Sequence, residues 1–248
     1  MELKNQKEIE LMREGGKILA HTLAETQKIC KAGMTTLEID SFIEKKIRLS
    51  GAIPSFLNYR KYPFHSCISI NEELVHGLPS MRIIKNSDII GLDIGVLYKG
   101  YHTDAAISFA IGSVSEIEQK LISVTKKSLL EGIKLIRPGV KIGSIQNKIQ
   151  EIIEQVGFSV VRDLCGHGIG KRLQESPCIP NYGTKNTGFR LEKGMTFCLE
   201  PMVAMGEYKV CTLSDGWTVA TCDMSKTAHF EHTIAVTENG HEILTSID

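Results

Sequence analysis

The chain has 248 residues and carries 29 basic and 29 acidic side chains, so its formal net charge is zero. This length allows one or two domains with a sizeable core, and the charge balance argues against nucleic-acid binding as the main function. The N-terminus lacks the apolar core of a signal peptide, no apolar run approaches the roughly 20 residues of a membrane span, and the seven cysteines form no C-x-x-C motif. We therefore expect a cytoplasmic protein whose cysteines are all reduced thiols.

Two helices followed by strands are predicted for the first half of the chain. Residues 7–31 place apolar side chains near one face of a long helix, and the capping box Thr35-x-x-Glu38 starts a second helix. Residues 52–84 mix strand and turn signals. Residues 88–110 are expected to form a hairpin around the turn Lys99-Gly100.

The second half begins with a similar arrangement. The capping box Ser115-x-x-Glu118 starts a third helix, Arg137-Pro-Gly139 ends it, and a fourth helix ends near Gly157. Strand signals dominate the remainder, at residues 160–162, 195–199, 208–212, 217–221 and 230–237. Two halves of paired helices and strands indicate an α+β fold around a mostly antiparallel sheet.

The two halves also repeat each other in sequence. A constant shift of 106 residues aligns residues 31–51 with residues 137–157, so that two amphipathic helices closed by glycine coincide. A shift of 107 places Leu92-Asp93 on Leu199-Glu200, and a shift of 127 places His102-Thr-Asp104 on His229-Phe-Glu231. A duplicated unit with a pseudo-twofold axis would bring both acid pairs to one site. The alternative is that such weak repeats arise by chance in a helix-rich chain.

Five side chains form a candidate metal site: Asp93, Asp104, His167, Glu200 and Glu231. Four carboxylates and one imidazole suit hard or borderline divalent ions better than a structural zinc ion, which prefers Cys and His. Two such ions about 3.5–4 Å apart can activate one water for hydrolysis. This residue set therefore favours a two-metal site.

Asp93 and Asp104 are expected on facing strands of the hairpin. If Lys99-Gly100 is a two-residue turn, Asp93 lies opposite Ala106, and Asp104 becomes its diagonal neighbour on the same face. Asp93 sits in an otherwise apolar strand, where an unpaired carboxylate is costly. Two like charges that close need a cation or a shared proton. The alternative is one surface carboxylate and one turn carboxylate.

The other three candidates come from the second half. His167 lies in the segment Cys165-Gly-His-Gly-Ile-Gly170, whose glycines permit close backbone approach but which lacks the Lys-Ser/Thr of a P-loop. Glu200 ends a strand, and Glu231 lies in another, where alternation makes His229 face the same side. A lone His is usually an ordinary core or surface residue, and a strand Glu is often solvated, so the argument depends on the whole group.

Six segments together resemble type I methionine aminopeptidases, and the resemblance runs from about residue 5 to residue 245. They are Glu73-Leu-Val-His76-Gly, Leu92-Asp93-Ile-Gly, His102-Thr-Asp104, Gly166-His167-Gly-Ile-Gly170, Leu199-Glu200-Pro201 and Phe230-Glu231-His232-Thr233. The resemblance implies the pita-bread α+β fold, in its bacterial form without a zinc-finger extension. It also implies one metallopeptidase domain over residues 1–248, with pseudo-symmetric halves at about 5–112 and 113–245.

The resemblance implies a role for each candidate residue. Asp93, Asp104, His167, Glu200 and Glu231 would hold two divalent ions (Mn, Fe, Co or Zn), with Asp104 and Glu231 shared by both. A water between the ions would attack the carbonyl of an N-terminal methionine, and Glu200 would help to take the proton of that water. Availability rather than affinity would decide which metal is bound in the cell.

The resemblance also implies the substrate contacts. His76 would hydrogen-bond the substrate near the scissile amide. The methionine side chain would enter an apolar pocket, whose soft sulfur and aromatic edges suit a thioether. Each lining residue alone has ordinary core packing as its alternative. The matching positions are Phe56, Tyr59, Tyr62, Cys67, Leu173 and Trp217.

Two positions depart from the family pattern. Gln174 stands where the family has a second catalytic histidine, and His229 stands where it commonly has glutamine. Gln174 can donate a hydrogen bond but cannot carry charge, and losing a charged donor in such a site costs on the order of 10²–10³ in rate. We hypothesise that His229 supplies part of the missing imidazole function. The alternative is that the two changes are independent.

The implied partners are peptides with an N-terminal methionine, and nascent chains near the ribosome, with a small second residue such as Gly, Ala or Ser. A cytoplasmic monomer that neither reads nucleic acid nor binds membranes is expected. One alternative is a proline-specific aminopeptidase or dipeptidase of the same fold, which usually has an extra N-terminal domain. Another is a non-enzymatic module that binds nascent chains or ribosomes, which only Gln174 favours.

Overall fold

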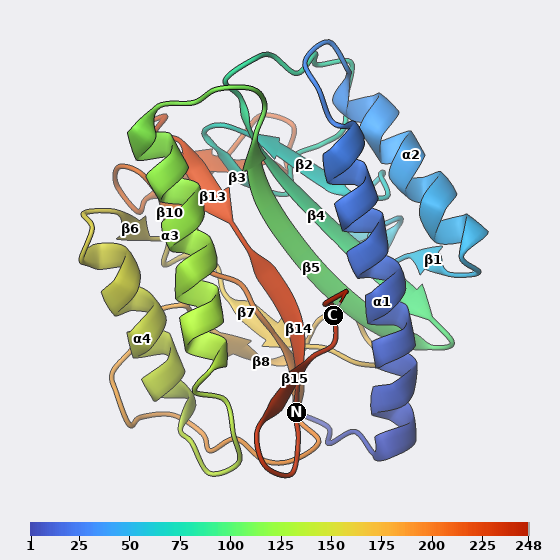
Figure 1. Cartoon of the computed structure of the whole chain (residues 1–248), viewed down its shortest axis with the longest axis vertical. Helices are drawn as coiled ribbons and strands as arrows, with labels where there is room; N and C mark the ends of the chain where they lie inside the picture. Colours follow the sequence, from blue (N-terminus) through green and yellow to red (C-terminus); the bar gives the residue numbers. More distant parts are fainter. Residues whose placement is uncertain (248) are drawn as a thin grey trace.

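The computed structural model describes residues 1–247 and contains four α-helices in this range (Figure 1). They are α1 (Gln6–Ile29), α2 (Thr36–Leu49), α3 (Glu116–Ile133) and α4 (Ile142–Glu154), and a short 3₁₀ helix, η1, covers Tyr59–Lys61. Capping boxes start the first three α-helices, at Asn5, Thr35 and Ser115. In each box the side chain of the cap and the Glu three residues later satisfy backbone N–H groups that the helix leaves free.

Fifteen strands lie in the described part of the chain. The first eight are β1 (Ile53–Pro54), β2 (Cys67–Ile70), β3 (Glu73–Val75), β4 (Ile89–Tyr98), β5 (Tyr101–Ala110), β6 (Ser159–Val160), β7 (Gly166–Gly168) and β8 (Glu175–Ile179). The others are β9 (Thr196–Leu199), β10 (Met202–Ala204), β11 (Val210–Thr212), β12 (Val219–Thr221), β13 (Thr227–His229), β14 (Glu231–Val236) and β15 (His241–Ile243).

Nine strands form the main sheet, in the order β1-β4-β5-β14-β9-β7-β8, with β2 paired to β4 and β15 paired to β14. Two small three-stranded sheets, β13-β10-β6 and β11-β12-β3, flank it. Every strand pair in the described residues is antiparallel. The α+β prediction with a mostly antiparallel sheet is confirmed.

The hairpin prediction is confirmed to the residue. Strands β4 and β5 pair along their whole length, from Ile89↔Ala110 to Tyr98↔Tyr101. Lys99 and Gly100 both have positive φ, 46° and 86°, as a two-residue turn that follows the twist of the strands requires. This turn fixes which residues of the two strands face each other.

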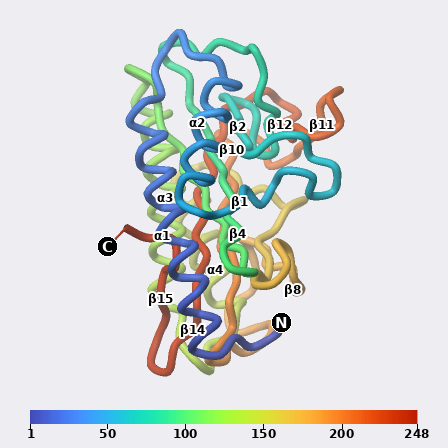
Figure 2. The backbone as a smooth tube through the Cα atoms, turned by 90° about the vertical axis from the view of Figure 1, so that its right-hand side faces the viewer, coloured from blue at the N-terminus to red at the C-terminus, as the bar shows by residue number. Residues whose placement is uncertain are grey.

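The helices and the small sheet β11-β12-β3 lie on opposite sides of the main sheet. In Figure 2, α1 and α3 follow one edge of the molecule, and β8, β11 and β12 lie toward the other. The helices cover one face because their apolar stripes need a partner surface. None of the helices within residues 1–247 has the length and hydropathy that crossing a membrane would demand.

The pseudo-symmetric repeat is visible in the backbone contacts that precede α2 and α4. Gly33 N–H donates to the Ile84 carbonyl at 2.9 Å, and Gly139 N–H donates to the Leu191 carbonyl at 2.8 Å. The N-caps of both helices, Thr35 and Lys141, form isolated antiparallel bridges, with Ile83 and Arg190 respectively. The segments that lead into α2 and α4 are therefore held by equivalent backbone contacts.

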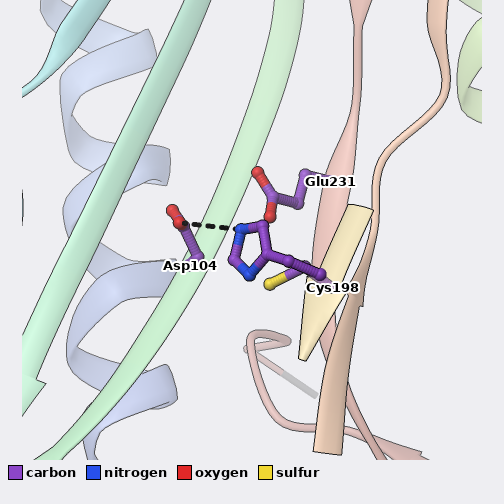
Figure 3. A group of neighbouring side chains, drawn as sticks. Asp104, Cys198 and Glu231 are labelled. Atoms are coloured by element: carbon purple, nitrogen blue, oxygen red, sulfur yellow. Dashed lines mark ion pairs between the residues drawn. The ribbon is translucent and has the colours of Figure 1, made fainter. Parts of the chain in front are cut away.

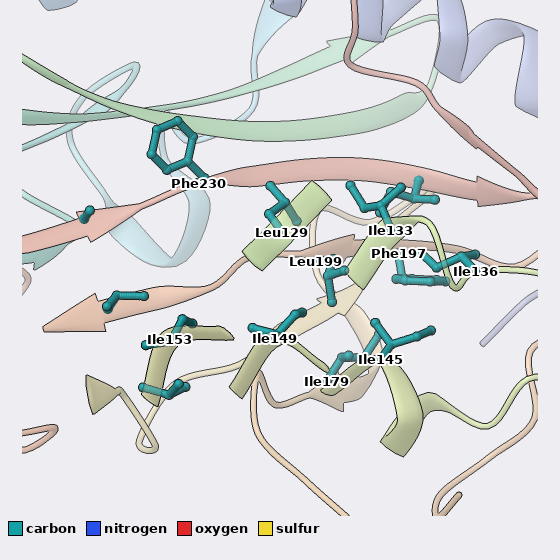
Figure 4. Packing of buried hydrophobic residues seen from close by; sticks show 14 of the residues in the cluster. Leu129, Ile133, Ile136, Ile145, Ile149, Ile153, Ile179, Phe197, Leu199 and Phe230 are labelled. Atoms are coloured by element: carbon teal, nitrogen blue, oxygen red, sulfur yellow. The ribbon is translucent and has the colours of Figure 1, made fainter. Parts of the chain in front are cut away.

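Each helix pair packs over its own apolar cluster. Helices α1 and α2 cover β2, β4 and β5, with Ile39, Ile43 and Ile47 fully buried. Helices α3 and α4 cover β9 and β14, where Ile149 of α4 lies in the same cluster as Phe197 and Leu199 (Figure 4). The isoleucines spaced four apart in α2 and α4 thus form the stripes that the sequence repeat predicted.

Three features of the strands were not predicted from the sequence. The glycine-rich segment around His167 forms a strand, β7. Strand β8 was not predicted. The segment predicted as one strand over residues 230–237 begins at Glu231, and a separate strand in a different sheet ends at His229. A glycine run carries no side-chain alternation, which is why β7 gave no strand signal.

The expectation that all seven cysteines are reduced thiols is wrong for two of them. Cys165 and Cys178 form a disulfide, with Cα atoms 5.7 Å apart. The pairing of β7 with β8, in which His167 lies opposite Cys178, brings the two residues within bonding range. The five cysteines described as free are Cys30, Cys67, Cys198, Cys211 and Cys222.

We predict that Ile149→Ala lowers the free energy of unfolding by about 2–5 kcal/mol, because it leaves a cavity in a fully buried cluster. Urea denaturation followed by circular dichroism measures this. The control is Ile117→Ala on α3, whose side chain is 45% exposed. Equal effects of the two substitutions would show that the stripe of α4 does not carry the packing.

Candidate functional site

The first two candidate ligands are held by the β4–β5 hairpin. Asp93 lies opposite Ala106, as predicted, and Asp104 lies opposite Gly95, so the two carboxylates are diagonal neighbours on one face. Thr233 of β14 holds the backbone of Asp104, because its hydroxyl accepts from Asp104 N–H and donates to the Asp104 carbonyl, both at 2.8 Å. At Asp104 this hydroxyl takes the place of the direct main-chain pairing that joins β5 and β14 at Ala105 and Ala106.

His167 and Glu200 come from neighbouring parts of β7 and β9. His167 Nδ1 donates to the Gly168 carbonyl at 2.9 Å, which leaves Nε2 as the free lone pair. Glu200 follows the last residue of β9, and its carbonyl accepts from Asn181 Nδ2 at 2.8 Å. A Cβ at Gly166 would lie 2.4 Å from the Cys198 carbonyl, so glycine is required for β7 to approach β9 this closely.

Glu231 and His229 stand on either side of a break in the sheet. His229 ends β13, which pairs with β10, whereas Glu231 begins β14, which pairs with β5. Ser108 of β5 bridges the break: its hydroxyl donates to the His229 carbonyl and accepts from His229 N–H, both at 2.9 Å. Side-chain hydroxyls on two strands thus replace main-chain pairing around the acids.

The candidate ligands converge in space. Nε2 of His167 lies 3.9 Å from Asp104 Oδ2 and 3.7 Å from Glu200 Oε1. Figure 3 shows Asp104, Glu231 and Cys198 directed toward one another, with a dashed line marking the ion pair of Asp104 with His167. One ligand atom from each of Asp104, His167, Cys198 and Glu231 lies within 4.8 Å of the others.

Sequence reasoning missed Cys198 as a neighbour of the acids. Alternation along β9 places it on the same side as Glu200, two residues on, and that was the available signal. Burial, followed by the charges of Glu231 and Asp104, raises the pKa of the Cys198 thiol well above its usual value. A protonated thiol is a hydrogen-bond donor beside the carboxylate of Glu231.

Several buried oxygens at the site lack any hydrogen-bond partner within residues 1–247. They are Asp93 Oδ1, Asp104 Oδ1 and Glu231 Oε1. A buried carboxylate oxygen without a partner is costly, and such costs are normally met by a ligand or a proton. Together with His167, these oxygens make a donor set that fits divalent cations.

The electrostatics of the metal-free site point the same way. Burial raises the pKa of Asp104, Glu200 and Glu231 well above the usual values, and repulsion between the carboxylates adds to this. Burial also raises the pKa of Asp93 to about 6, against partial relief from His229 and Asp104. The site therefore resists holding four negative charges unless a cation neutralises them.

All fourteen residues predicted for the site line one cavity: Phe56, Tyr59, Tyr62, Cys67, His76, Asp93, Asp104, His167, Leu173, Gln174, Glu200, Trp217, His229 and Glu231. The sequence reasoning missed five further lining residues, namely Arg60, Val75, Leu164, Cys165 and Met202. These five come from η1, β3, β10 and the segment before β7. No local pattern marked them, because lining a cavity depends on how distant segments meet.

Aromatic rings form one wall of the cavity. The ring of Tyr62 meets Trp217 edge to face at 5.1 Å and Phe56 at 6.5 Å. The Tyr62 hydroxyl donates toward the carbonyls of Ser66 and Gly77, at 3.0 and 3.1 Å, which fixes the ring. An apolar, rigid wall beside an acidic cluster suits a substrate with one apolar side chain next to a polar group.

His76 enters the cavity from a strained backbone position. It directly follows β3 and has a φ of 59°, a region that non-glycine residues seldom adopt. The next residue, Gly77, is pinned to β2, where a Cβ would lie 2.4 Å from the Ile68 carbonyl. Burial lowers the pKa of His76 to about 4, with smaller contributions from His229 and Arg60. His76 is therefore a neutral imidazole near pH 7.

Gln174 and His229 lie in different parts of the cavity. Gln174 accepts a hydrogen bond from the Tyr59 hydroxyl at 3.2 Å, in an exposed position. His229 is 3% exposed, and its Nε2 lies 3.7 Å from Glu200 Oε2. Burial lowers the pKa of His229, against the opposing charge of Asp93. Gln174 thus lies at the mouth, whereas His229 lies among the acids.

Comparison with known proteins agrees with this geometry. A model of metallopeptidase family M24 matches residues 10–238. The chain belongs to this family. Methionine aminopeptidase 1 of Bacillus subtilis is 47% identical over 244 residues, which cover 98% of either chain.

Solved structures extend the comparison to the fold. The crystal structure of a methionine aminopeptidase from Thermotoga maritima matches with a TM-score of 0.98 at 43% identity, covering 99% of either chain. Prolidase from Pyrococcus furiosus shares the fold with a TM-score of 0.81 at 22% identity, over 99% of this chain and 66% of its own. The expected pita-bread fold is confirmed.

We predict that Asp104→Asn stabilises the metal-free protein near pH 7 by about 1–2 kcal/mol, because it removes a buried carboxylate whose pKa is raised by burial and repulsion. The folded-state pKa lies above the unfolded one, so the cost of the native Asp grows as pH rises. The gain from the substitution therefore shrinks as pH falls toward about 4. Thermal unfolding after chelation measures this.

The matched control is Asp163→Asn, which neutralises an exposed carboxylate. We expect no gain from it in the metal-free protein. With a saturating divalent ion the native protein should be more stable than the Asp104→Asn variant. Ion binding stabilises the native protein, and the variant has lost a ligand. A destabilised metal-free Asp104 variant would contradict the electrostatic account.

Proposed function

We propose that this protein removes the N-terminal methionine from peptides as a metal-dependent aminopeptidase. The observation that carries the proposal is the meeting of four carboxylates and an imidazole beside an aromatic-walled cavity. Its support from relatives is the 47% identity to methionine aminopeptidase 1 of Bacillus subtilis over nearly the whole chain. We also propose that residues 1–248 form one catalytic domain, with halves at about 5–112 and 113–245. Residue 248 lies outside the described part of the chain.

The residues proposed to hold two divalent ions are Asp93, Asp104, His167, Glu200 and Glu231, with Asp104 and Glu231 shared. The buried oxygens without partners and the free Nε2 of His167 support this set. Bound divalent ions would polarise the carbonyl of the scissile bond and lower the pKa of the attacking water. Carboxylate-rich ligation accepts Mn, Fe, Co or Zn.

The protein's own groups would then handle protons and position the substrate. Glu200 is proposed to take a proton from the attacking water, because its carboxylate lies among the proposed ligands, 3.7 Å from Nε2 of His167. His76 is proposed to donate a hydrogen bond to the substrate near the scissile amide. Its neutral imidazole and its fixed backbone suit a positioned donor.

The aromatic wall is proposed as the pocket for the methionine side chain. Cys67 and Leu173 are both buried beside Phe56 and Tyr62, in one apolar cluster. Sulfur and aromatic edges make favourable contacts with a thioether. This apolar surface near the acids would orient the first residue of the peptide, so that its scissile bond lies beside the proposed metal ligands.

The proposal extends to nascent chains near the ribosome as substrates, to a small second residue, to a monomer and to the cytoplasm. Its support for these points is the likeness to methionine aminopeptidases of bacteria. The two alternative functions find less support. The prolidase likeness concerns the fold alone, and a binding module without catalysis would have no need of a complete set of buried acids.

The decisive experiment titrates the metal-free protein with Mn²⁺, Fe²⁺, Co²⁺ and Zn²⁺ and measures free methionine from Met-Ala-Ser. We expect methionine release that depends on metal. We expect no release of alanine from Ala-Pro peptides. Glu200→Gln should lower kcat by about 10²–10⁴, because it removes a proton acceptor and a charged ligand oxygen.

The control for that variant is Glu207→Gln, at an exposed position. It should leave methionine release unchanged. Tight metal binding without any methionine release would refute the aminopeptidase proposal and favour a binding role.

A separate prediction concerns Gln174. We expect Gln174→His to raise kcat by about tenfold or more, because an imidazole at the cavity mouth can carry a charge that an amide cannot. Steady-state kinetics on Met-Ala-Ser measure this. Tyr59→Phe is the control, since it removes the hydrogen bond to Gln174 without adding an imidazole. An unchanged kcat would mean that a charged imidazole at residue 174 does not speed the reaction.

A further inference from the structure

We propose that His229 is a sixth metal-binding side chain of this site, and that it binds an ion through Nε2 together with Glu200 and Glu231. The inference rests on the proposed metal site and goes beyond the five proposed ligands. It is a different role from the hypothesis that His229 supplies part of the missing imidazole function at Gln174. A lone pair that binds an ion is not free to exchange protons with a substrate.

The distances of His229 to the acids match those of His167. Nε2 of His229 lies 3.7 Å from Glu200 Oε2 and 3.9 Å from Glu231 Oε2. Nε2 of His167 lies 3.7 Å from Glu200 Oε1 and 3.9 Å from Asp104 Oδ2. Two atoms that each lie about 2.1 Å from one ion are at most about 4.2 Å apart. Both imidazoles therefore satisfy this limit, one at each oxygen of Glu200.

The environment of Nε2 is the second observation. His229 is 3% exposed, and its Nε2 is buried without a hydrogen-bond partner in the described part of the chain. An imidazole nitrogen in that state normally has a ligand or carries a cost. One ligand atom from each of Glu200, His229 and Glu231 lies within 4.8 Å of the others. The three residues thus form a ligand group of their own.

The backbone holds His229 in this position. Its N–H and carbonyl are both bonded to the Ser108 hydroxyl at 2.9 Å. It also lies opposite Met202 in the pairing of β13 with β10. A ligand held by two strands loses little conformational freedom when an ion binds, which favours binding.

A sixth ligand that is a nitrogen changes which ions the site prefers. Imidazole favours borderline ions such as Co²⁺ and Zn²⁺ relative to Mn²⁺, which prefers oxygen. The loss of the imidazole should therefore weaken Co²⁺ binding more than Mn²⁺ binding. A residue that only supports the fold would weaken both ions alike.

The test combines calorimetric titration of the metal-free protein with proton NMR of the Co²⁺-loaded protein. His229→Gln should weaken Co²⁺ binding by about tenfold or more, with a smaller loss for Mn²⁺. The matched control is His21→Gln, on the exposed face of α1, which should change neither. The native protein should show two strongly shifted, exchangeable imidazole N–H signals, from His167 and His229, and the variant only one.

The NMR measurement on the native protein needs no variant, so a misfolded His229→Gln does not end the test. A single strongly shifted imidazole signal in the native protein would overturn the inference and leave the five-ligand site intact. Equal losses of Co²⁺ and Mn²⁺ affinity in the variant would also overturn it. Failure of the native protein to bind Co²⁺ or Mn²⁺ would overturn the proposed function as well.

Discussion

The rest of this structure depends on the burial of four carboxylates within one site. Burial and mutual repulsion raise the pKa of Asp104, Glu200 and Glu231 well above their usual values. Such a cluster opposes folding unless a cation is bound, so the surrounding scaffold must provide stability from elsewhere. Two apolar clusters under paired helices do so, one on each side of the acids along the main sheet.

Main-chain pairing between strands is interrupted where the acids meet, and two hydroxyl groups bond to the backbone there. Thr233 bridges the backbone of Asp104, and Ser108 bridges the backbone of His229. Direct pairing of β5 with β14 is confined to Glu231↔Ala106 and His232↔Ala105. The hydroxyls form hydrogen bonds with backbone groups that have no main-chain partner. The interrupted pairing therefore lowers stability little, and the neighbouring side chains stay in fixed positions.

Much of the fold could be predicted because its signals are local. Capping boxes, isoleucines four apart and a two-residue turn are short-range patterns, and they placed α2, α4 and the β4–β5 hairpin. That hairpin alone positions Asp93 beside Asp104. The strand β7 and the disulfide between Cys165 and Cys178 left no such signal. The first is a glycine segment, and the second depends on a pairing with β8 that no spacing reveals.

The case of His229 shows where sequence equivalence stops. The repeat aligns His102-Thr-Asp104 with His229-Phe-Glu231, yet the two histidines have different surroundings. In β5 the strand is continuous, and the Ser55 hydroxyl lies 2.8 Å from Nδ1 of His102. At Phe230 the chain leaves one sheet for another, and His229 comes within 3.9 Å of Glu231. The break in the strand, rather than the residue type, therefore gives His229 its place among the acids.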